Sequence, residues 1–265
     1  MPYGLKKYSI QSLGIPVHSI PTYSITDPST GGNSNGTPDL TDPNLLHAWN
    51  FDEGAGLSVD DGKGSMDGTI TGAVWNGAGA FGYAGDNSLD FDGSDAVYFP
   101  PSNPSFSEMV GVSSDFTVYM WFNTDTGSTR QYMCGDFDVS TAHLSCTLEL
   151  SSGNGIVYDI YAANGGRIRT TYAAGVSTST WYFVALTFNN TTKQAILYLN
   201  GVQVSTTTNA GMNDLRNNAG QQWNVGDAGV WAGFKFRGLL DSPYVYDDIR
   251  TPAEILTDYN NWQAA

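Results

Sequence analysis

From Leu45 onward, short runs of alternating apolar and polar residues are separated by turns rich in Gly, Asp, Asn and Ser. In "DFTVYMWFNT", Phe116, Val118 and Met120 alternate with Thr117 and Tyr119. A period of two is typical of a β-strand with one buried face. About a dozen such runs follow one another at short, regular spacing, which predicts an antiparallel two-sheet sandwich.

Several pairs of runs predict β-hairpins. In "AILYLNGVQV", Asn200 and Gly201 tolerate positive φ and can form a two-residue turn between two strands. A second hairpin is predicted in "NSLDFDGSDAVYFP", around Asp92 and Gly93. "RQYMCGDF" and "SCTLELSS" flank a loop, and "IVYDIYAA" and "RIRTTYAA" flank "NGG".

One helix is predicted, at the end of the chain. Thr251 is a good N-cap, Pro252 a good first helical residue, and Glu254 completes a capping box. The helix has an apolar face for docking, formed by Ile255, Leu256 and Tyr259.

Residues 1–38 differ from the rest and predict an extended N-terminal arm ahead of a domain over residues 39–265. They hold five of the eleven prolines, and "YSI", "HSI" and "YSI" recur at 8–10, 18–20 and 23–25. Proline prevents both helix and central strand, so the arm has no core of its own. We expect it to be an assembly anchor whose apolar side chains contact a partner: Tyr8, Ile10, Ile15, Val17, Ile20, Tyr23 and Ile25.

The chain has a formal net charge of −15, and only 14% of its residues are charged. An acidic chain repels phosphate backbones, so nucleic-acid binding is not expected. No apolar run reaches the length of a membrane span. The first 30 residues lack a continuous apolar stretch, so no signal peptide is expected and synthesis in a cytoplasm is predicted.

Five stretches, in this order, resemble the laminin-G-like, concanavalin A-like jelly-roll family over about residues 45–262. They are "LLHAWNFDEGAG", "GAVWNGAGAFGYAGDNSLDFDGSDAVYF", "DFTVYMWFNTD", "WYFVALTFNNTTKQAILYLNGVQV" and "FRGLLDSPYVYDDIRTPAEI". The resemblance implies an all-β jelly-roll sandwich of two stacked antiparallel sheets with a short C-terminal helix. It also implies binding of glycans or proteins, and often a structural calcium ion.

Catalysis is not expected. Glycoside hydrolases need two carboxyl groups about 5–10 Å apart, and related hydrolases carry a Glu-x-Asp-x-Glu run that is missing here. Asp90 and Asp92 have i, i+2 spacing but lie in a turn. The four glutamates are dispersed, and the three histidines have no Ser or Cys partner pattern: Glu53, Glu108, Glu149, Glu254, His18, His47 and His143.

Two kinds of binding site are predicted. Calcium takes several carboxylate and carbonyl oxygens, which Asp60, Asp61, Asp92 and Asp241 offer if their loops meet; the alternative is that they are ordinary turn residues. For glycans, aromatic rings beside Gly, Asn and Asp can stack on sugars. The candidates, for which packing is the alternative role, are Trp75, Tyr172, Trp223 and Trp231, whereas Trp49, Trp121 and Trp181 are assigned to the core.

Cys134 and Cys146 are expected to be free thiols, with a hairpin-spanning disulfide as the alternative. The function predicted first is a non-enzymatic virion structural protein, a phage capsid-decorating or fibre-type subunit on the virion surface. Its expected partners are capsid proteins, copies of itself and cell-surface glycans. The alternative is an extracellular carbohydrate-binding or adhesion module, and a hydrolase comes last.

Overall fold

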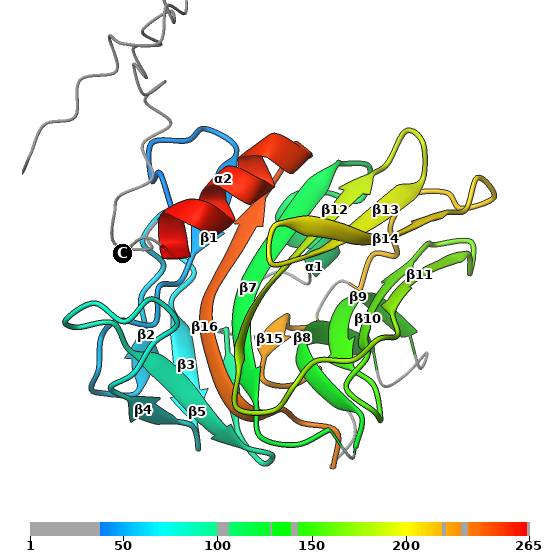
Figure 1. Cartoon of the computed structure of the whole chain (residues 1–265). Coiled ribbons are helices and arrows are strands. Elements are labelled where there is room, and N and C mark those ends of the chain that lie inside the picture. The colour runs from blue at the N-terminus through cyan, green and yellow to red at the C-terminus, as the bar shows by residue number, and fades with distance from the viewer. Residues whose placement is uncertain are drawn as a thin grey trace, which may run out of the picture. The chain divides into compact units, whose positions relative to one another are not determined.

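The computed structural model describes residues 38–99, 106–127, 129–138, 143–218, 221–228 and 233–263, all within the unit Gly31–Ala265. These residues form two antiparallel sheets and two helices, as Figure 1 shows. The predicted all-β sandwich with a C-terminal helix is confirmed. The arm residues lie outside the described residues: Tyr8, Ile10, Ile15, Val17, Ile20, Tyr23 and Ile25.

The first sheet has the strand order β14-β13-β12-β7-β16-β5-β4, and β1 pairs with β16 beside this path. Its eight strands in the described residues are β1 (Leu45–Ala48), β4 (Val74–Asn76), β5 (Ser88–Asp92), β7 (Phe116–Thr124), β12 (Trp181–Asn189), β13 (Gln194–Leu199), β14 (Val202–Thr208) and β16 (Arg237–Tyr246).

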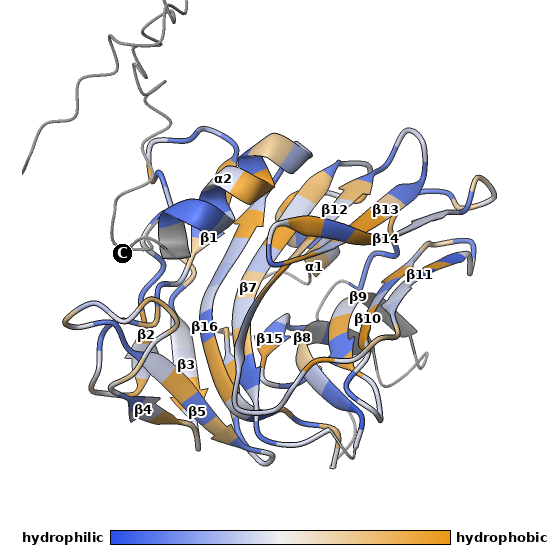
Figure 2. Cartoon of the chain, viewed as in Figure 1, coloured by the Kyte–Doolittle hydropathy of each residue, from blue (hydrophilic) through white to orange (hydrophobic). Residues whose placement is uncertain are grey.

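The second sheet has the order β11-β10-β9-β8-β15-β6-β3-β2. Its eight strands in the described residues are β2 (Ser58–Val59), β3 (Gly68–Thr71), β6 (Ala96–Tyr98), β8 (Gln131–Asp138), β9 (His143–Leu150), β10 (Ile156–Tyr161), β11 (Arg167–Tyr172) and β15 (Asn224–Val225). Figure 2 shows apolar and polar residues alternating along many of these strands, as the sequence pattern predicts.

The main core lies between the sheets and is rich in aromatic rings. Trp49, Phe99 and Trp223 are fully buried, and their ring centroids lie 4.7–5.6 Å apart. The short helix α1 (Phe106–Val110), which the sequence pattern did not predict, adds Phe106 to this cluster. Cys134 and Cys146 are buried in the same core as free thiols.

One predicted hairpin is wrong. The chain on either side of Asp92 and Gly93 does not pair with itself, because β5 belongs to the first sheet and β6 to the second. The turn is a corner at which the chain passes between sheets. Within the turn, the Asp95 carboxylate accepts the backbone N–H of Asp92 at 2.7 Å, and the Asp92 carboxylate accepts the backbone N–H of Ser94 at 2.8 Å.

The other predicted hairpins are confirmed: β8 pairs with β9, β10 with β11 and β13 with β14. Asn200 and Gly201 have φ values of 50° and 75°, which is the combination that a tight I′ hairpin turn requires. The Asn200 side chain also accepts the backbone N–H of Phe183 at 2.9 Å, so this turn is tied to β12.

The C-terminal helix α2 (Pro252–Gln263) begins at the predicted capping box. The backbone N–H of Thr251 donates to Glu254 at 2.7 Å, and the backbone N–H of Glu254 donates to the Thr251 hydroxyl at 3.3 Å. The helix packs on the outer face of the first sheet, where Tyr259 stacks on Trp121 and Phe183 (Figure 1). Neither described helix is long and apolar enough to span a membrane.

The first and last strands of the described domain are held together. β1 pairs with β16 so that Leu45 lies opposite Tyr246. Beyond the pairing, Asn44 donates to Asp248 at 3.0 Å and Arg250 forms an ion pair with Asp42 at 2.9 Å. The segment before β1 is therefore fastened to the segment that joins β16 to α2.

Candidate functional site

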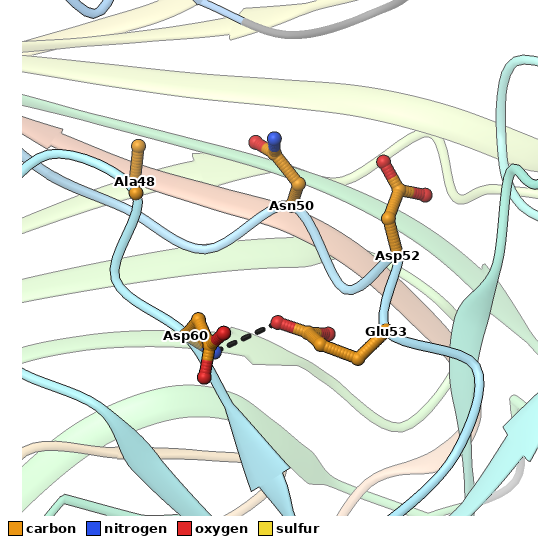
Figure 3. Close-up of a pocket in the computed structure, with 6 residues that line it drawn as sticks. Ala48, Asn50, Asp52, Glu53 and Asp60 are labelled. Atoms are coloured by element: carbon orange, nitrogen blue, oxygen red, sulfur yellow. Dashed lines mark hydrogen bonds between the residues drawn. The ribbon is translucent and has the colours of Figure 1, made fainter.

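The loop that follows β1 forms one wall of a small cavity of about 270 Å³, shown in Figure 3. Its lining is mostly polar and acidic: Ala48, Asn50, Asp52, Glu53, Asp60 and Gly62. Three of its polar side chains, those of Asn50, Asp52 and Glu53, already accept hydrogen bonds within the protein. Glu53 accepts the backbone N–H of Asp60 at 2.7 Å, and Asn50 accepts the hydroxyl of Tyr244 at 2.8 Å.

The two neighbouring carboxyl groups of this cavity do not form an acid–base pair. In Figure 3 the Glu53 side chain extends towards Asp60, whereas the Asp52 side chain points away from it. Asp52 accepts the hydroxyl of Tyr83 at 2.7 Å and the backbone N–H of Asn87 at 3.2 Å. Burial raises the pKa of Asp52 despite these hydrogen bonds. Asp52 therefore fastens the segment that contains Tyr83 and Asn87.

Two more carboxyl groups are buried near Asp52 and act on the same segment. Asp241 is fully buried and accepts the backbone N–H of Ala80 at 2.8 Å. Asp86 accepts the backbone N–H of Phe81 at 2.7 Å. Burial, together with the negative charges of the other acids, raises the pKa of both Asp241 and Asp86. These three aspartates fold the loop between β4 and β5 against the first sheet.

The four aspartates predicted to bind calcium are not brought together into one site. Asp61 is buried and binds five donors of its own loop and of β1: His47 Nδ1 and the backbone N–H groups of Ala48, Lys63, Gly64 and Met66. Asp92 is exposed in the sheet corner, Asp241 holds Ala80, and Asp60 is exposed.

In the described part of the chain, no group of three or more His, Cys, Asp or Glu is positioned to hold a metal ion. The oxygens of Asp61 are already used as acceptors, and its hydrogen bonds outweigh burial and lower its pKa to about 2. These residues therefore do not fit a calcium ion as a group. Calcium binding by the chain remains a prediction.

A second polar surface lies on the outer side of the second sheet, on strands β8 to β11. The register alternates regularly along β9, β10 and β11, whereas the pairing of β8 with β9 has two shifts. Leu148, Tyr158 and Ile168 point into the core, whereas Glu149, Asp159 and Arg169 point outward. We call this surface the β8–β11 face and define it by its outward side chains: Arg130, Tyr132, Thr147, Glu149, Val157, Asp159, Tyr161, Arg167, Arg169 and Thr171.

A ladder of ion pairs crosses the β8–β11 face. Arg167 and Arg169 both bind Asp159, with Nη2 to Oδ2 distances of 2.7 and 2.6 Å, and Arg130 binds Glu149. The carboxylates are buried, but the three arginine side chains are 34–43% exposed. Although burial raises the pKa of Asp159, the hydrogen bonds from Arg169 and Arg167 outweigh it and lower the pKa. The guanidinium groups thus form the outermost layer.

Aromatic rings support these arginines. The Arg130 guanidinium lies over the ring of Tyr132, 4.9 Å from its centroid, and that of Arg167 lies over Tyr161 at 5.2 Å. The pattern continues on β6, which is further across the same sheet. Lys235 lies 5.6 Å from the ring centroid of Tyr98 and donates to its hydroxyl at 3.1 Å.

The described helices leave the β8–β11 face open. The buried side chains of α1 belong to the region between the sheets, and α2 packs on the first sheet. On or beside the face, three buried polar atoms have no hydrogen-bond partner among the described residues: Tyr132 Oη, Thr147 Oγ1 and Asn224 Oδ1. These three atoms are shielded from solvent, so the accessible part of the face consists mainly of the Tyr161 ring and the guanidinium groups of Arg130, Arg167 and Arg169.

The aromatic residues predicted to bind glycans do not converge. Trp223 is fully buried beside Trp49 and Phe99, so its assignment to a binding surface is wrong. Trp75 lies half-buried on β4 and donates to the carbonyl of Gly56 at 3.0 Å. Tyr172 is half-buried at the end of β11, in the other sheet. Trp231 lies outside the described residues.

Sequence reasoning missed the β8–β11 face, although a signal is present. In the hairpin around "NGG", Asp159 and Tyr161 share the polar side of one strand, and Arg167 and Arg169 share that of the other. A hairpin register counted outward from the turn places Tyr161 opposite Arg167 and Asp159 opposite Arg169.

Comparison with known proteins identifies the fold of this chain. Residues 91–256 match the family model described as the concanavalin A-like lectin/glucanases superfamily. No curated protein matches the chain in sequence.

Among solved structures, the binding domain of Paraclostridial Mosquitocidal Protein 1 is similar with a TM-score of 0.63 and 15% identity, over 83% of this chain and 52% of that one. The binding domain of botulinum neurotoxin serotype D is similar with a TM-score of 0.61 and 12% identity, over 82% and 51%. This chain therefore spans about half the length of these two toxin domains.

Domain 4 of AbnA, a GH43 extracellular arabinanase from Geobacillus stearothermophilus solved in complex with arabinotriose, gives a TM-score of 0.54 and 17% identity. The match covers 81% of this chain and 98% of that domain. At these identities the similarity establishes the shared fold.

Proposed function

The chain belongs to the concanavalin A-like lectin/glucanases superfamily, and from this premise we propose that it is a non-catalytic glycan-binding domain. The observation that carries the proposal is the accessible part of the β8–β11 face, where the half-buried ring of Tyr161 lies beside the partly exposed guanidinium groups of Arg167 and Arg169. An aromatic ring can pack on the apolar face of a sugar, while charged and polar groups bind its hydroxyls.

The similar structures support this proposal through what they are described as binding or being. Domain 4 of the arabinanase was solved with a bound oligosaccharide, and the two toxin domains are described as binding domains. The arrangement of the carboxyl groups also favours binding over hydrolysis. Asp52 and Glu53 point in different directions, and Glu149 and Asp159 are covered by arginines.

The test is affinity electrophoresis of the full chain in gels that contain soluble polysaccharides, both neutral and acidic. We expect at least one polysaccharide to retard the protein. Tyr161→Ala should weaken this retardation about three- to tenfold, because it removes an accessible ring of the face. The melting temperature of each variant shows whether the fold is intact.

Trp75→Ala is the matched control, because Trp75 is a half-buried aromatic residue on an edge strand of the other sheet. Retardation lost in Trp75→Ala but kept in Tyr161→Ala would move the binding site to the β4 edge. A folded protein that no polysaccharide retards would contradict the proposed function.

We further propose that residues 1–38 attach this domain to a larger assembly, in the first place to the surface of a virus particle. The support is the sequence of this segment, with its five prolines and its repeated apolar triplets. Extended segments of this kind bind by adding a strand to a partner or by wrapping it. Many copies on one assembly would raise the avidity of a weak glycan site by about 10²–10⁴-fold.

Deletion of residues 1–38 tests the attachment. The truncated domain should keep its melting temperature and its glycan binding but should no longer be incorporated into particles. Normal incorporation of the truncated chain would contradict the attachment proposal and leave the glycan-binding proposal unaffected.

A further inference from the structure

The positive charges of this acidic protein are concentrated on one sheet. The chain has 11 Lys and Arg against 26 Asp and Glu. Four of the eleven cationic residues lie on the outer side of the second sheet: Arg130, Arg167, Arg169 and Lys235. Their ion-pair partners there are the three acids Glu149, Asp159 and Asp227, so these seven side chains sum to +1 in a chain of −15.

We propose that the glycan bound by the β8–β11 face is acidic and carries carboxylate or sulfate groups that bind the exposed arginines. This inference rests on the proposed glycan-binding function and specifies its ligand.

The arginines present unused donors to solvent. Arg167 commits Nε and Nη2 to Asp159, at 2.7 Å each, and Arg169 commits the same two atoms to Asp159. The Nη1 group of each guanidinium has no partner among the described residues. Two neighbouring planar guanidinium groups, each with a free Nη1, can donate to the oxygens of one carboxylate or sulfate.

The guanidinium groups lie outside the carboxylates that they bind, so a ligand meets positive charge first. The carboxylate of Asp159 has no exposed surface and that of Glu149 is 3% exposed, whereas Arg169 is 43% exposed. An approaching glycan therefore meets guanidinium groups first. The buried carboxylates hold these groups in place, which reduces the entropy lost when a ligand binds.

The accessible rings on this side of the sheet suit an extended ligand. Tyr161 on β10 and Tyr98 on β6 are both half-buried, and their strands are separated by four steps across the sheet. At about 4.8 Å per step this is about 19 Å, the span of several sugar rings. Tyr132 and Glu149 belong to strands between them, and Arg130 directly precedes β8. We therefore expect an oligosaccharide that crosses the strands.

The probe is polygalacturonate, and the matched ligand is the same polymer after methyl esterification, which removes its charge and keeps its backbone. Affinity electrophoresis at rising salt should show retardation by polygalacturonate that weakens at least tenfold on esterification and falls between 0.05 and 0.5 M NaCl, over which range the screening length shortens from about 14 to about 4 Å. A sulfated polysaccharide run in parallel distinguishes sulfate from carboxylate recognition. Non-specific adsorption of these polyanions is disfavoured by the net charge of −15.

Arg167→Gln is the test variant, because Arg169 still neutralises Asp159 and the fold is retained. It should weaken retardation by the acidic polymer about tenfold and retardation by the esterified polymer much less, and Arg167→Lys should restore part of the loss with the acidic polymer. Arg237→Gln, which removes an exposed arginine from the first sheet, should change nothing.

The outcomes separate this inference from the proposed function. Equal retardation by charged and esterified polymer, unaltered in Arg167→Gln, would overturn the acidic ligand and leave glycan binding in place. Absence of retardation by every polysaccharide, with normal melting, would overturn both. Loss of retardation in Arg237→Gln as well would show that overall charge, and not this face, controls binding.

Discussion

Gly201 is constrained in two independent ways. Its φ of 75° is strained for any residue with a side chain, and a Cβ atom there would lie 2.9 Å from Leu256 Cδ1 and 3.3 Å from Leu256 Cα. The hairpin turn between β13 and β14 thus lies directly against α2. A residue chosen for its backbone conformation also sets how closely a distant helix approaches the sheet.

We expect Gly201→Ala to destabilise the domain by about 2–3 kcal/mol, of which about 1 kcal/mol comes from the backbone and the rest from overpacking against α2. Urea unfolding measures the loss. Gly165→Ala is the control, because Gly165 has a φ of 82° in another hairpin turn but open space around its Cβ position. An equal loss of unfolding free energy in the two variants would show that overpacking against α2 does not contribute to the effect of Gly201→Ala.

Other residues show why a binding site is hard to find from sequence. Trp223 lies beside Asn and Gly, as a loop residue would, but its ring reaches the core between the sheets. The segment around Asp61 has the composition of a calcium-binding loop, yet the carboxylate oxygens of Asp61 accept hydrogen bonds from the backbone of that segment. In both cases the residues adjacent in sequence suit either role, and the folded conformation of the surrounding segment decides between them.

The helix α2 depends on the hydrogen bonds at its first turn. The Thr251 hydroxyl accepts a backbone N–H that would otherwise have no partner in the helix. We expect Thr251→Ala to destabilise the domain by about 1 kcal/mol. Because Tyr259 of this helix stacks on Trp121, the intrinsic fluorescence should begin to change at lower temperature in the variant.

Thr257→Ala provides a comparison within the same helix. The Thr257 hydroxyl donates to the carbonyl of Ala253, which already belongs to the helical hydrogen-bond pattern. Alanine has the higher helix propensity at this exposed position, so the change should be neutral or slightly stabilising. A loss as large as that of Thr251→Ala would argue against a specific role of the cap.

At the level of elements, local patterns predicted most strands, three hairpins and the start of α2. They failed at the turn between β5 and β6, because a corner between two sheets uses the same Asp-Gly chemistry as a hairpin. Which of the two forms depends on the partner strands β16 and β15, both more than a hundred residues away in sequence. The charged pairs of the β8–β11 face come from consecutive hairpins and could have been counted from the turns, but the side of these strands that faces outward depends on how the two sheets stack.

The whole molecule combines carboxyl groups with opposite responses to pH. The raised pKa values of Asp52, Asp86 and Asp241 mean that their contribution to stability is complete below about pH 4 and is lost as pH rises through the folded-state values. Asp61, with a pKa of about 2, contributes stability above about pH 4 that is lost as pH falls towards 2.

We therefore expect the free energy of unfolding to be greatest in mildly acidic solution and to fall on both sides. Asp241→Asn should raise the stability at pH 8 and flatten the decline above the pH of greatest stability. Asp247→Asn, at an exposed position, should leave the curve unchanged. Thermal melting between pH 3 and pH 9 measures all three curves. An unchanged decline in Asp241→Asn would show that Asp241 does not cause it.

The pairing of β1 with β16 has a mechanical consequence. Leu45 and Tyr246 lie opposite each other at one end of this strand pair, and α2 follows β16. Tension between the two ends of the domain therefore first pulls α2 from the sheet and then loads the strand pair from one side, so that its hydrogen bonds open one after another. The first contacts of the strand pair to open would be the hydrogen bond between the Asp247 N–H and the Asn44 carbonyl and the ion pair between Arg250 and Asp42. Under a stretching force, this domain would peel apart at its ends while the stacked sheets behind them stay intact.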